Sequence, residues 1–213
     1  MRIDIYADTI CPWCLIGKRR LERALAERPQ PAVAITWRAF QLNPNMPQEG
    51  MERSHYMELK FGGADRARQV YEPVLAAGAA EGIAFAFDRM VRTPNTALSH
   101  RLVRYATAQG RGEAAMEAVF QAYFTEARDI GDTGVLLEVG EAVGLERPGL
   151  EAFLGGTEGL LEVLAEDARA REIGIQGVPT YIFAQKYVLS GAHPPEVLFQ
   201  LFDLANRDGA AAD

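Results

Sequence analysis

The chain has only two cysteines in 213 residues, and both belong to one motif, Cys11-Pro12-Trp13-Cys14. The motif lies where a strand pattern changes into a helix pattern. Residues 2–7 alternate polar and apolar side chains, which is typical of a half-buried strand, and residues 15–25 place apolar side chains at helical spacing among charged ones. A Cys-x-x-Cys motif at such a junction is most simply interpreted as a thiol–disulfide redox centre.

The start of a helix suits this chemistry. Its unpaired N–H groups and the positive end of its dipole favour a sulfur anion, which is the nucleophile in disulfide exchange. Pro12 fits the first helical position, where a proline loses no hydrogen bond. We therefore predict that Cys11 is the attacking thiol and that Cys14, one turn further on, is the resolving thiol. Trp13 is expected on the surface rim beside Cys11, where it can contact a bound polypeptide.

Two other interpretations of the motif are weaker. A zinc site needs two further ligands, but the chain has no second cysteine pair. His55, His100 and His193 also lack the usual spacing of zinc-binding histidines. A purely structural disulfide would close a very small loop and would stabilise little. We therefore expect no metal and no resident cofactor.

A second signal lies near the end of the chain. Residues 180–183 and 187–189 are rich in β-branched and aromatic side chains, which predicts a β-hairpin. Gly177-Val178-Pro179-Thr180 stands directly before it. Either a cis proline forms the turn there, or a trans proline opens an edge strand. In both cases the backbone at Val178 is free to pair with an extended peptide.

Taken together, these signals resemble the thioredoxin superfamily, and the whole chain resembles the DsbA-like family and its intracellular FrnE-like subgroup. The resemblance rests on motifs distributed along the chain in order, at residues 8–17, 40–44, 95–102, 123–132 and 177–180.

The resemblance implies an α/β chain with a thioredoxin-like fold and an inserted all-helical domain. It also implies a dithiol–disulfide oxidoreductase or isomerase. Cys11 and Cys14 match the redox pair, and Pro179 matches the cis proline facing that pair. Pro12, Trp13, Val178 and Pro179 are then expected at the rim of the active site. The substrates would be protein or small-molecule thiols and disulfides, with glutathione as a candidate redox partner.

The same broad family includes 2-hydroxychromene-2-carboxylate isomerases and kappa-class glutathione transferases. These proteins usually have serine where Cys11 stands. Because this chain keeps both thiols, redox chemistry is favoured. Glutathione-dependent isomerase or transferase activity stays as the alternative.

The pattern of residue types divides the chain into two parts. Residues 1–45 and 170–213 are predicted to form the thioredoxin-like domain, with a second strand at 32–40. Residues 46–169 are predicted to form the helical insertion, with an extended loop at 83–87. The insertion and the segment after it have periodic apolar positions that predict helices over 51–61, 63–80, 95–109, 112–127, 132–143, 147–154 and 157–173.

The net charge and the distribution of apolar residues limit the kinds of partner and location that we expect. A net charge of −7 argues against a general nucleic-acid binder. No run of about 18 apolar residues occurs, so no membrane span is expected. The start of the printed sequence lacks a signal-peptide pattern, which predicts a cytoplasmic protein if that start is native. A homodimer through the helical insertion is a further expectation.

Several polar residues receive local interpretations. Asp8 is expected to cap the helix that carries Cys11, with a proton relay as the alternative. Asn95, Thr96 and His100 lie at near-helical spacing and could form a polar cluster toward the groove. Helix capping by Asn95 or Thr96, and a surface or capping role for His100, are the favoured interpretations. We interpret Arg128 and Asp129 as an ion pair that fixes a loop. The basic run is interpreted as a solvated helix face and comprises Lys18, Arg19, Arg20 and Arg23.

Overall fold

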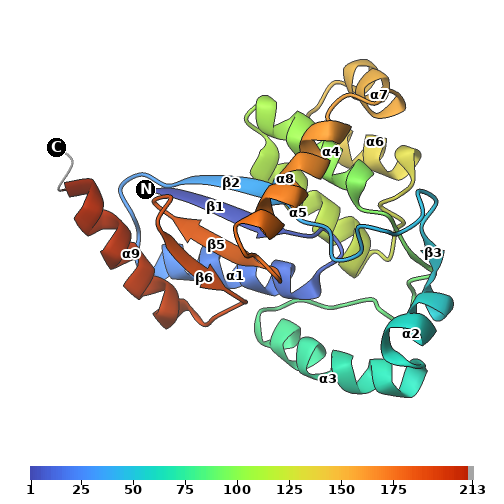
Figure 1. The fold of residues 1–213 in the computed structure, drawn as a ribbon, viewed down its shortest axis with the longest axis horizontal. Coiled ribbons are helices and arrows are strands. Elements are labelled where there is room, and N and C mark those ends of the chain that lie inside the picture. The colour runs from blue at the N-terminus through green and yellow to red at the C-terminus, as the bar shows by residue number, and fades with distance from the viewer. Residues whose placement is uncertain (211–213) are drawn as a thin grey trace.

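The fold, a computed structural model that describes residues 1–210, is built around a four-stranded sheet (Figure 1). The strand order is β2-β1-β5-β6. β1 and β2 are parallel and joined through helix α1, whereas β5 runs antiparallel to β1 and β6 antiparallel to β5. The elements of this part are β1 Arg2–Ala7, α1 Pro12–Glu27, β2 Ala34–Ala39, β5 Thr180–Phe183, β6 Tyr187–Ser190 and α9 Pro195–Ala210.

The segment between β2 and β5 is helical apart from one short two-stranded sheet. The predicted boundary between residues 169 and 170 falls within its last helix, α8. The elements are β3 Met51–Glu52, α2 Arg53–Phe61, α3 Ala64–Ala80, β4 Arg92–Thr93, α4 Ala97–Ala108, α5 Gly112–Phe120, the π-helix η1 Gln121–Thr125, α6 Thr133–Ala142, α7 Arg147–Gly155 and α8 Leu160–Glu172.

The sequence patterns located most elements. The strands predicted at 2–7 and 180–183 are confirmed, as is the extended loop at 83–87. The helix predicted at 51–61 differs at its start, because residues 51–52 pair with β4 before α2 begins. The helix predicted at 112–127 is divided, since its second half winds as the π-helix η1.

The two faces of the sheet have different partners. Ile3 and Ile5 of β1 are fully buried in a large cluster that also contains residues of α1 and α9. Tyr6 points to the opposite face, as the two-residue period of a strand requires. There it packs with Phe40 and with Ala170 of α8.

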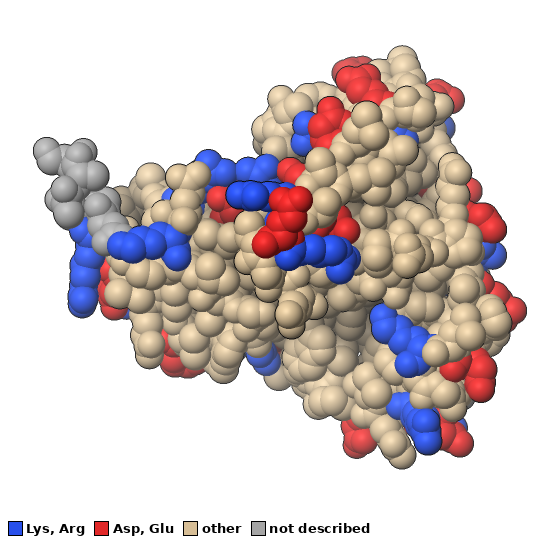
Figure 2. All heavy atoms as spheres, in the orientation of Figure 1, with Lys and Arg blue, Asp and Glu red and all other residues tan. Residues whose placement is uncertain are grey.

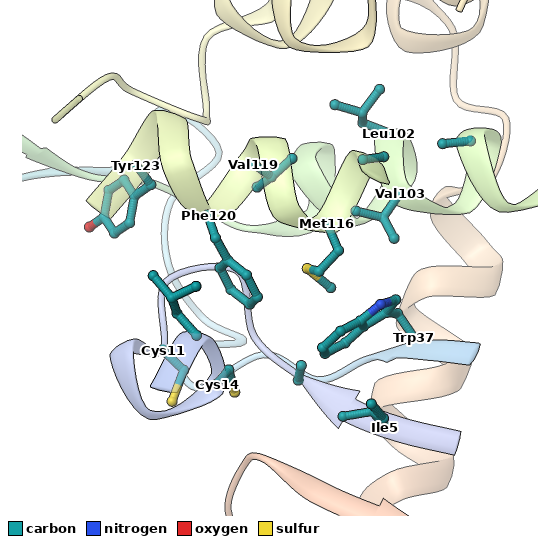
Figure 3. Packing of buried hydrophobic residues seen from close by; sticks show 14 of the residues in the cluster. Ile5, Cys11, Cys14, Trp37, Leu102, Val103, Met116, Val119, Phe120 and Tyr123 are labelled. Atoms are coloured by element: carbon teal, nitrogen blue, oxygen red, sulfur yellow. The ribbon is translucent and has the colours of Figure 1, made fainter. Parts of the chain in front are cut away.

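The helical insertion packs directly on the sheet. Trp37 of β2 meets Phe120 of α5 edge-on, with ring centroids 6.2 Å apart. Figure 3 shows Trp37 facing Phe120 and Met116 of α5, with Ile5 below. Because these side chains belong to the cluster that also contains Cys11, the first turn of α1 lies where the sheet and the insertion meet.

The basic run on α1 is only partly a solvated face, because Arg23 is exposed but Lys18 is buried and Arg20 is largely buried. Lys18 is only 3% exposed, and its Nζ lies 2.9 Å from Glu117 and 3.2 Å from Glu113, both on α5. Arg20 pairs with Glu81 at 2.9 Å. The insertion supplies the carboxylates for these cations, which the pattern of α1 alone does not reveal. On the face shown in Figure 2, positive and negative side chains likewise adjoin where α8 lies over β2.

Candidate active site

The N-terminus of α1 places Cys11 at the positive end of the helix dipole. Cys11 is the residue just before the helix and has an extended backbone, and Pro12 begins the helix. The Cys11 N–H donates to the Asp8 carbonyl at 3.0 Å, and the Cys14 N–H donates to the Cys11 carbonyl at 3.0 Å. These bonds fix the turn that carries the two thiols. A sulfur anion at Cys11 would face the unpaired N–H groups of the first helical turn.

Both thiols are free and buried, with exposures of 4% for Cys11 and 1% for Cys14. Figure 3 shows the two sulfur atoms pointing the same way, away from α5. Burial raises the pKa of the Cys14 thiol well above its usual range, and the hydrogen bond and charge of Cys11 raise that pKa further. Cys14 is therefore held in its protonated form.

The loop before β5 lies against Cys11. The Val178–Pro179 peptide bond is cis, and the Cys11 thiol donates to the Val178 carbonyl oxygen at 3.5 Å. The fold thus brings together the two motifs that are farthest apart in the sequence. Pro12 and Trp13 are both half-buried, and Trp13 packs against the core cluster that contains Cys11.

Gly17 allows this close approach. It is buried on α1, beneath the loop that contains Pro179. A Cβ atom on Gly17 would lie 2.2 Å from Tyr181 Oη and 3.0 Å from Pro179 Cγ. A side chain here would require the buried Tyr181 hydroxyl to move and would crowd the Pro179 ring, so glycine lets α1 approach the proline loop without such shifts.

A buried polar pair beneath the motif was not expected from the sequence. Asp8 is fully buried, and its Oδ2 accepts from the Leu42 N–H at 2.6 Å. His100 is 3% exposed, and its Nε2 lies 3.7 Å from Asp8 Oδ1 and 3.2 Å from the Phe40 carbonyl oxygen. Asp8 therefore joins the end of β1 to the segment after β2 and to α4.

Two expectations for these residues were wrong. Helix α1 has no side-chain cap. Toward α1, the Asp8 carboxylate accepts only from the Ile10 N–H, at 3.4 Å, which lies before the helix begins. His100 is neither at the surface nor a cap, because α4 packs against β2 and turns it inward. The signals in the sequence were the near-helical spacing of Asn95, Thr96 and His100 and the position of both residues in segments that carry the family resemblance.

Other local interpretations had mixed outcomes. The N-cap position of α4 is Thr96, which makes no side-chain cap bond, but Oδ1 of the preceding Asn95 accepts from the Ala97 N–H at 2.9 Å. The expected pair between Arg128 and Asp129 is wrong. Arg128 instead pairs with glutamates at positions 126 and 138, and Asp129 pairs with Arg92 at 3.4 Å.

The described residues contain no group of three or more His, Cys, Asp and Glu side chains that could hold a metal ion. Over the same part of the chain, every helix is too short or too polar to cross a lipid bilayer.

Comparison with known proteins places this geometry in context. A family model described as DSBA-like thioredoxin domain matches residues 2–203. The crystal structure of a probable DsbA oxidoreductase from Streptomyces coelicolor is 32% identical in sequence. The match covers 96% of this chain and 89% of that chain, with a TM-score of 0.87.

Two more distant structures share the fold. A 2-hydroxychromene-2-carboxylate isomerase is 18% identical, with complete coverage of both chains and a TM-score of 0.72. The cytosolic disulfide reductase DsbM from Pseudomonas aeruginosa, in a structure with GSH, is 23% identical, with 89% and 90% coverage and a TM-score of 0.64. At these identities the likeness is one of fold.

Proposed function

Because this chain belongs to the DSBA-like thioredoxin domain family, we propose that it is a dithiol–disulfide oxidoreductase or isomerase acting through Cys11 and Cys14. The expected thioredoxin-like fold with a helical insertion is confirmed. One observation carries the proposal: Cys11 lies at the N-terminus of α1, with its sulfur 3.5 Å from the carbonyl oxygen that precedes the cis proline.

The first step forms a mixed disulfide. The Cys11 thiolate attacks one sulfur of the substrate disulfide, so that a new S–S bond forms and the substrate S–S bond breaks. The other substrate sulfur leaves as a thiolate and takes a proton from water. Cys11 is then linked to the substrate, and the Cys14 thiol lies beside the new bond.

The second step releases the substrate. The Cys14 sulfur attacks Cys11 Sγ, which forms the Cys11–Cys14 disulfide and expels the second substrate sulfur as a thiolate, and the Cys14 proton passes through water to that thiolate. Two electrons have then passed from the protein dithiol to the substrate. Two molecules of an external thiol such as glutathione return the protein to its dithiol form and leave as their disulfide, and the reverse sequence oxidises a substrate dithiol.

The high pKa of Cys14 supports this order of events. Because burial keeps the Cys14 thiol protonated, it does not compete with Cys11 for the substrate disulfide. It becomes a nucleophile only when the disulfide at Cys11 is next to it. We further propose that the protein acts in the cytoplasm. A homodimer formed through the helical insertion stays a prediction.

A second candidate is a glutathione-dependent isomerase or transferase acting on a small aromatic compound. It is favoured by the structural match to the isomerase, which covers the whole length of both chains. The two candidates differ in what they require of Cys14. Disulfide chemistry needs it to complete each turnover, whereas an isomerase would keep its activity without it and would bind glutathione saturably.

The test is thiol-driven reduction of a model protein disulfide by wild type, Cys11→Ser and Cys14→Ser. We expect catalysis by wild type and none by Cys11→Ser. Full activity in Cys11→Ser would reject the proposed role of Cys11. An inert wild type with saturable glutathione binding would favour the isomerase.

A further inference from the structure

A groove runs beside α3 near the candidate active site. Its cavity is about 730 Å³, within the size range of ligand pockets, and its lining is predominantly apolar. The lining includes the apolar and aromatic side chains of Met57, Tyr71, Leu75, Phe85 and Phe87, together with Arg53, Arg68 and the carboxylates of Glu72 and Asp88. The aromatic ones form a continuous wall, since the Phe87 ring centroid lies 4.6 Å from those of both Phe85 and Tyr71.

Arg53 is the unusual member of this lining. Its Nη2 donates to Tyr71 Oη at 3.0 Å, and its Nη1 donates to Thr93 Oγ1 at 3.3 Å and to Tyr123 Oη at 3.4 Å. All three acceptors are neutral hydroxyl groups. Its guanidinium carbon also lies 5.5 Å from the Tyr71 ring centroid.

The charge of Arg53 is uncompensated within the described part of the chain. Among residues 1–210, no carboxylate lies within ion-pair distance of it, and its Nε is buried without an acceptor. A guanidinium carries a full positive charge on five N–H donors, and holding it without a carboxylate partner is unfavourable. A carboxylate bound in the groove would compensate that charge at the Nη atoms.

The groove adjoins α3, which contacts the helix that carries Cys11. Tyr71 packs against the core cluster that includes Cys11, and α3 contacts α1. In Figure 1, the N-terminal end of α1 faces α3. Burial raises the pKa of Tyr71, and the charge of Cys11 acts in the same direction.

We propose that this groove binds a peptide segment of the disulfide substrate that carries an acidic side chain and an apolar side chain next to its cysteine. The carboxylate accepts hydrogen bonds from Arg53, and the apolar side chain lies against the wall of Tyr71, Phe85 and Phe87. This inference rests on the proposed function, since a substrate cysteine joined to Cys11 brings its neighbouring residues to the groove.

The test uses two peptides that differ at one position. Each contains a cysteine in mixed disulfide with 2-mercaptoethanol and a leucine nearby, together with either glutamate or glutamine. The measurement is kcat/KM for reduction by the dithiol protein. We expect about tenfold faster reduction of the glutamate peptide at low salt, because charge-assisted hydrogen bonds to arginine are strong, and a smaller ratio at high salt.

Two variants assign the preference to Arg53. In Arg53→Gln the ratio should fall to about one, and in Arg53→Lys it should be intermediate because the charge stays while the planar donor array is lost. Arg68→Gln is the matched control, since Arg68 also lines the groove but is exposed and pairs with Asp65. It should keep the wild-type ratio.

The outcomes separate the two proposals. A wild-type ratio near one, or an unchanged ratio in Arg53→Gln, would overturn the role of the groove. Failure of wild type to reduce either peptide would instead count against the proposed function. If Arg53→Gln does not fold, the wild-type ratio and its salt dependence still decide the question.

Discussion

The sulfur of Cys11 lies 3.5 Å from the carbonyl oxygen of Val178, a residue 167 positions further along the chain. The contact joins the first turn of α1 to the loop that precedes β5. In the dithiol form, this carbonyl accepts a hydrogen bond from the Cys11 thiol. We expect that once Cys11 is deprotonated the carbonyl can accept an N–H from a substrate backbone, which would link activation of the thiol to binding of an extended peptide.

Removing the resolving thiol should trap the intermediate. In Cys14→Ser, Cys11 still attacks the substrate disulfide, but no internal thiol releases the product. We therefore expect a covalent complex with the substrate that disappears on addition of a reductant. Mass spectrometry of non-reduced samples measures it, with the Cys11→Ser/Cys14→Ser double variant as the control. An equal amount of complex in that control would contradict the role of Cys11.

The charge of Asp8 should influence Cys14. Burial is the largest cause of the raised pKa of Cys14, and Cys11 follows, but the negative charge of Asp8 acts in the same direction. Asp8→Asn removes that charge and keeps an acceptor for the Leu42 N–H. The Cys14 pKa should therefore fall, which the pH dependence of alkylation measures in a Cys11→Ser background. A rise in that pKa would disprove the electrostatic role of Asp8.

Glu117 should make stability depend on acid pH. Burial alone would raise its pKa, but hydrogen bonds from Arg19 and Lys18 outweigh burial and hold that pKa at about 2. A lowered pKa contributes stability above the ordinary value of about 4.3 that is lost as the pH falls to about 2. Glu117→Gln should thus lower the free energy of unfolding by about 2–3 kcal/mol at pH 7.

Denaturant unfolding of wild type and Glu117→Gln across this pH range tests the prediction. The difference between them should vanish near pH 2. Glu22→Gln is the matched control, because Glu22 pairs with the same Lys18 but is about half exposed. It should cost less than about 1 kcal/mol. A difference for Glu117→Gln that does not change with pH would point to packing rather than charge.

Gly17→Ala should damage the contact between α1 and the Pro179 loop. The added methyl group overlaps Tyr181 Oη and approaches the Pro179 ring. Overpacking of this kind costs about 1–3 kcal/mol of unfolding free energy and shifts nearby backbone. We expect lower stability in thermal unfolding and slower disulfide reduction.

Gly155→Ala provides the comparison, since a Cβ there meets nothing within 4 Å at the end of α7. It should be neutral or slightly stabilising, because alanine favours a helix more than glycine does. Equal effects of the two substitutions would show that the close approach of Gly17 to the proline loop has no special importance.

The sequence predicts some features much better than others. Alternation and residue type located β1, β5 and β6, because these signals are local. The pair of Asp8 and His100 could not be predicted, since it exists only once α4 packs against β2. The burial of Lys18 likewise depends on glutamates about one hundred residues away. Periodicity indicates which face of a helix is buried, but not which helix covers it.

The most direct test of the account is equilibrium titration of the Cys11–Cys14 pair against glutathione buffers. Thiol alkylation and mass spectrometry measure the fraction oxidised, and Trp13 fluorescence follows the same transition. We predict that both thiols disappear together in one two-electron transition, with a midpoint between about −270 mV, as in thioredoxin, and about −120 mV, as in DsbA. If both thiols stay alkylatable in the most oxidising buffer, the pair is not a redox centre and the account is wrong.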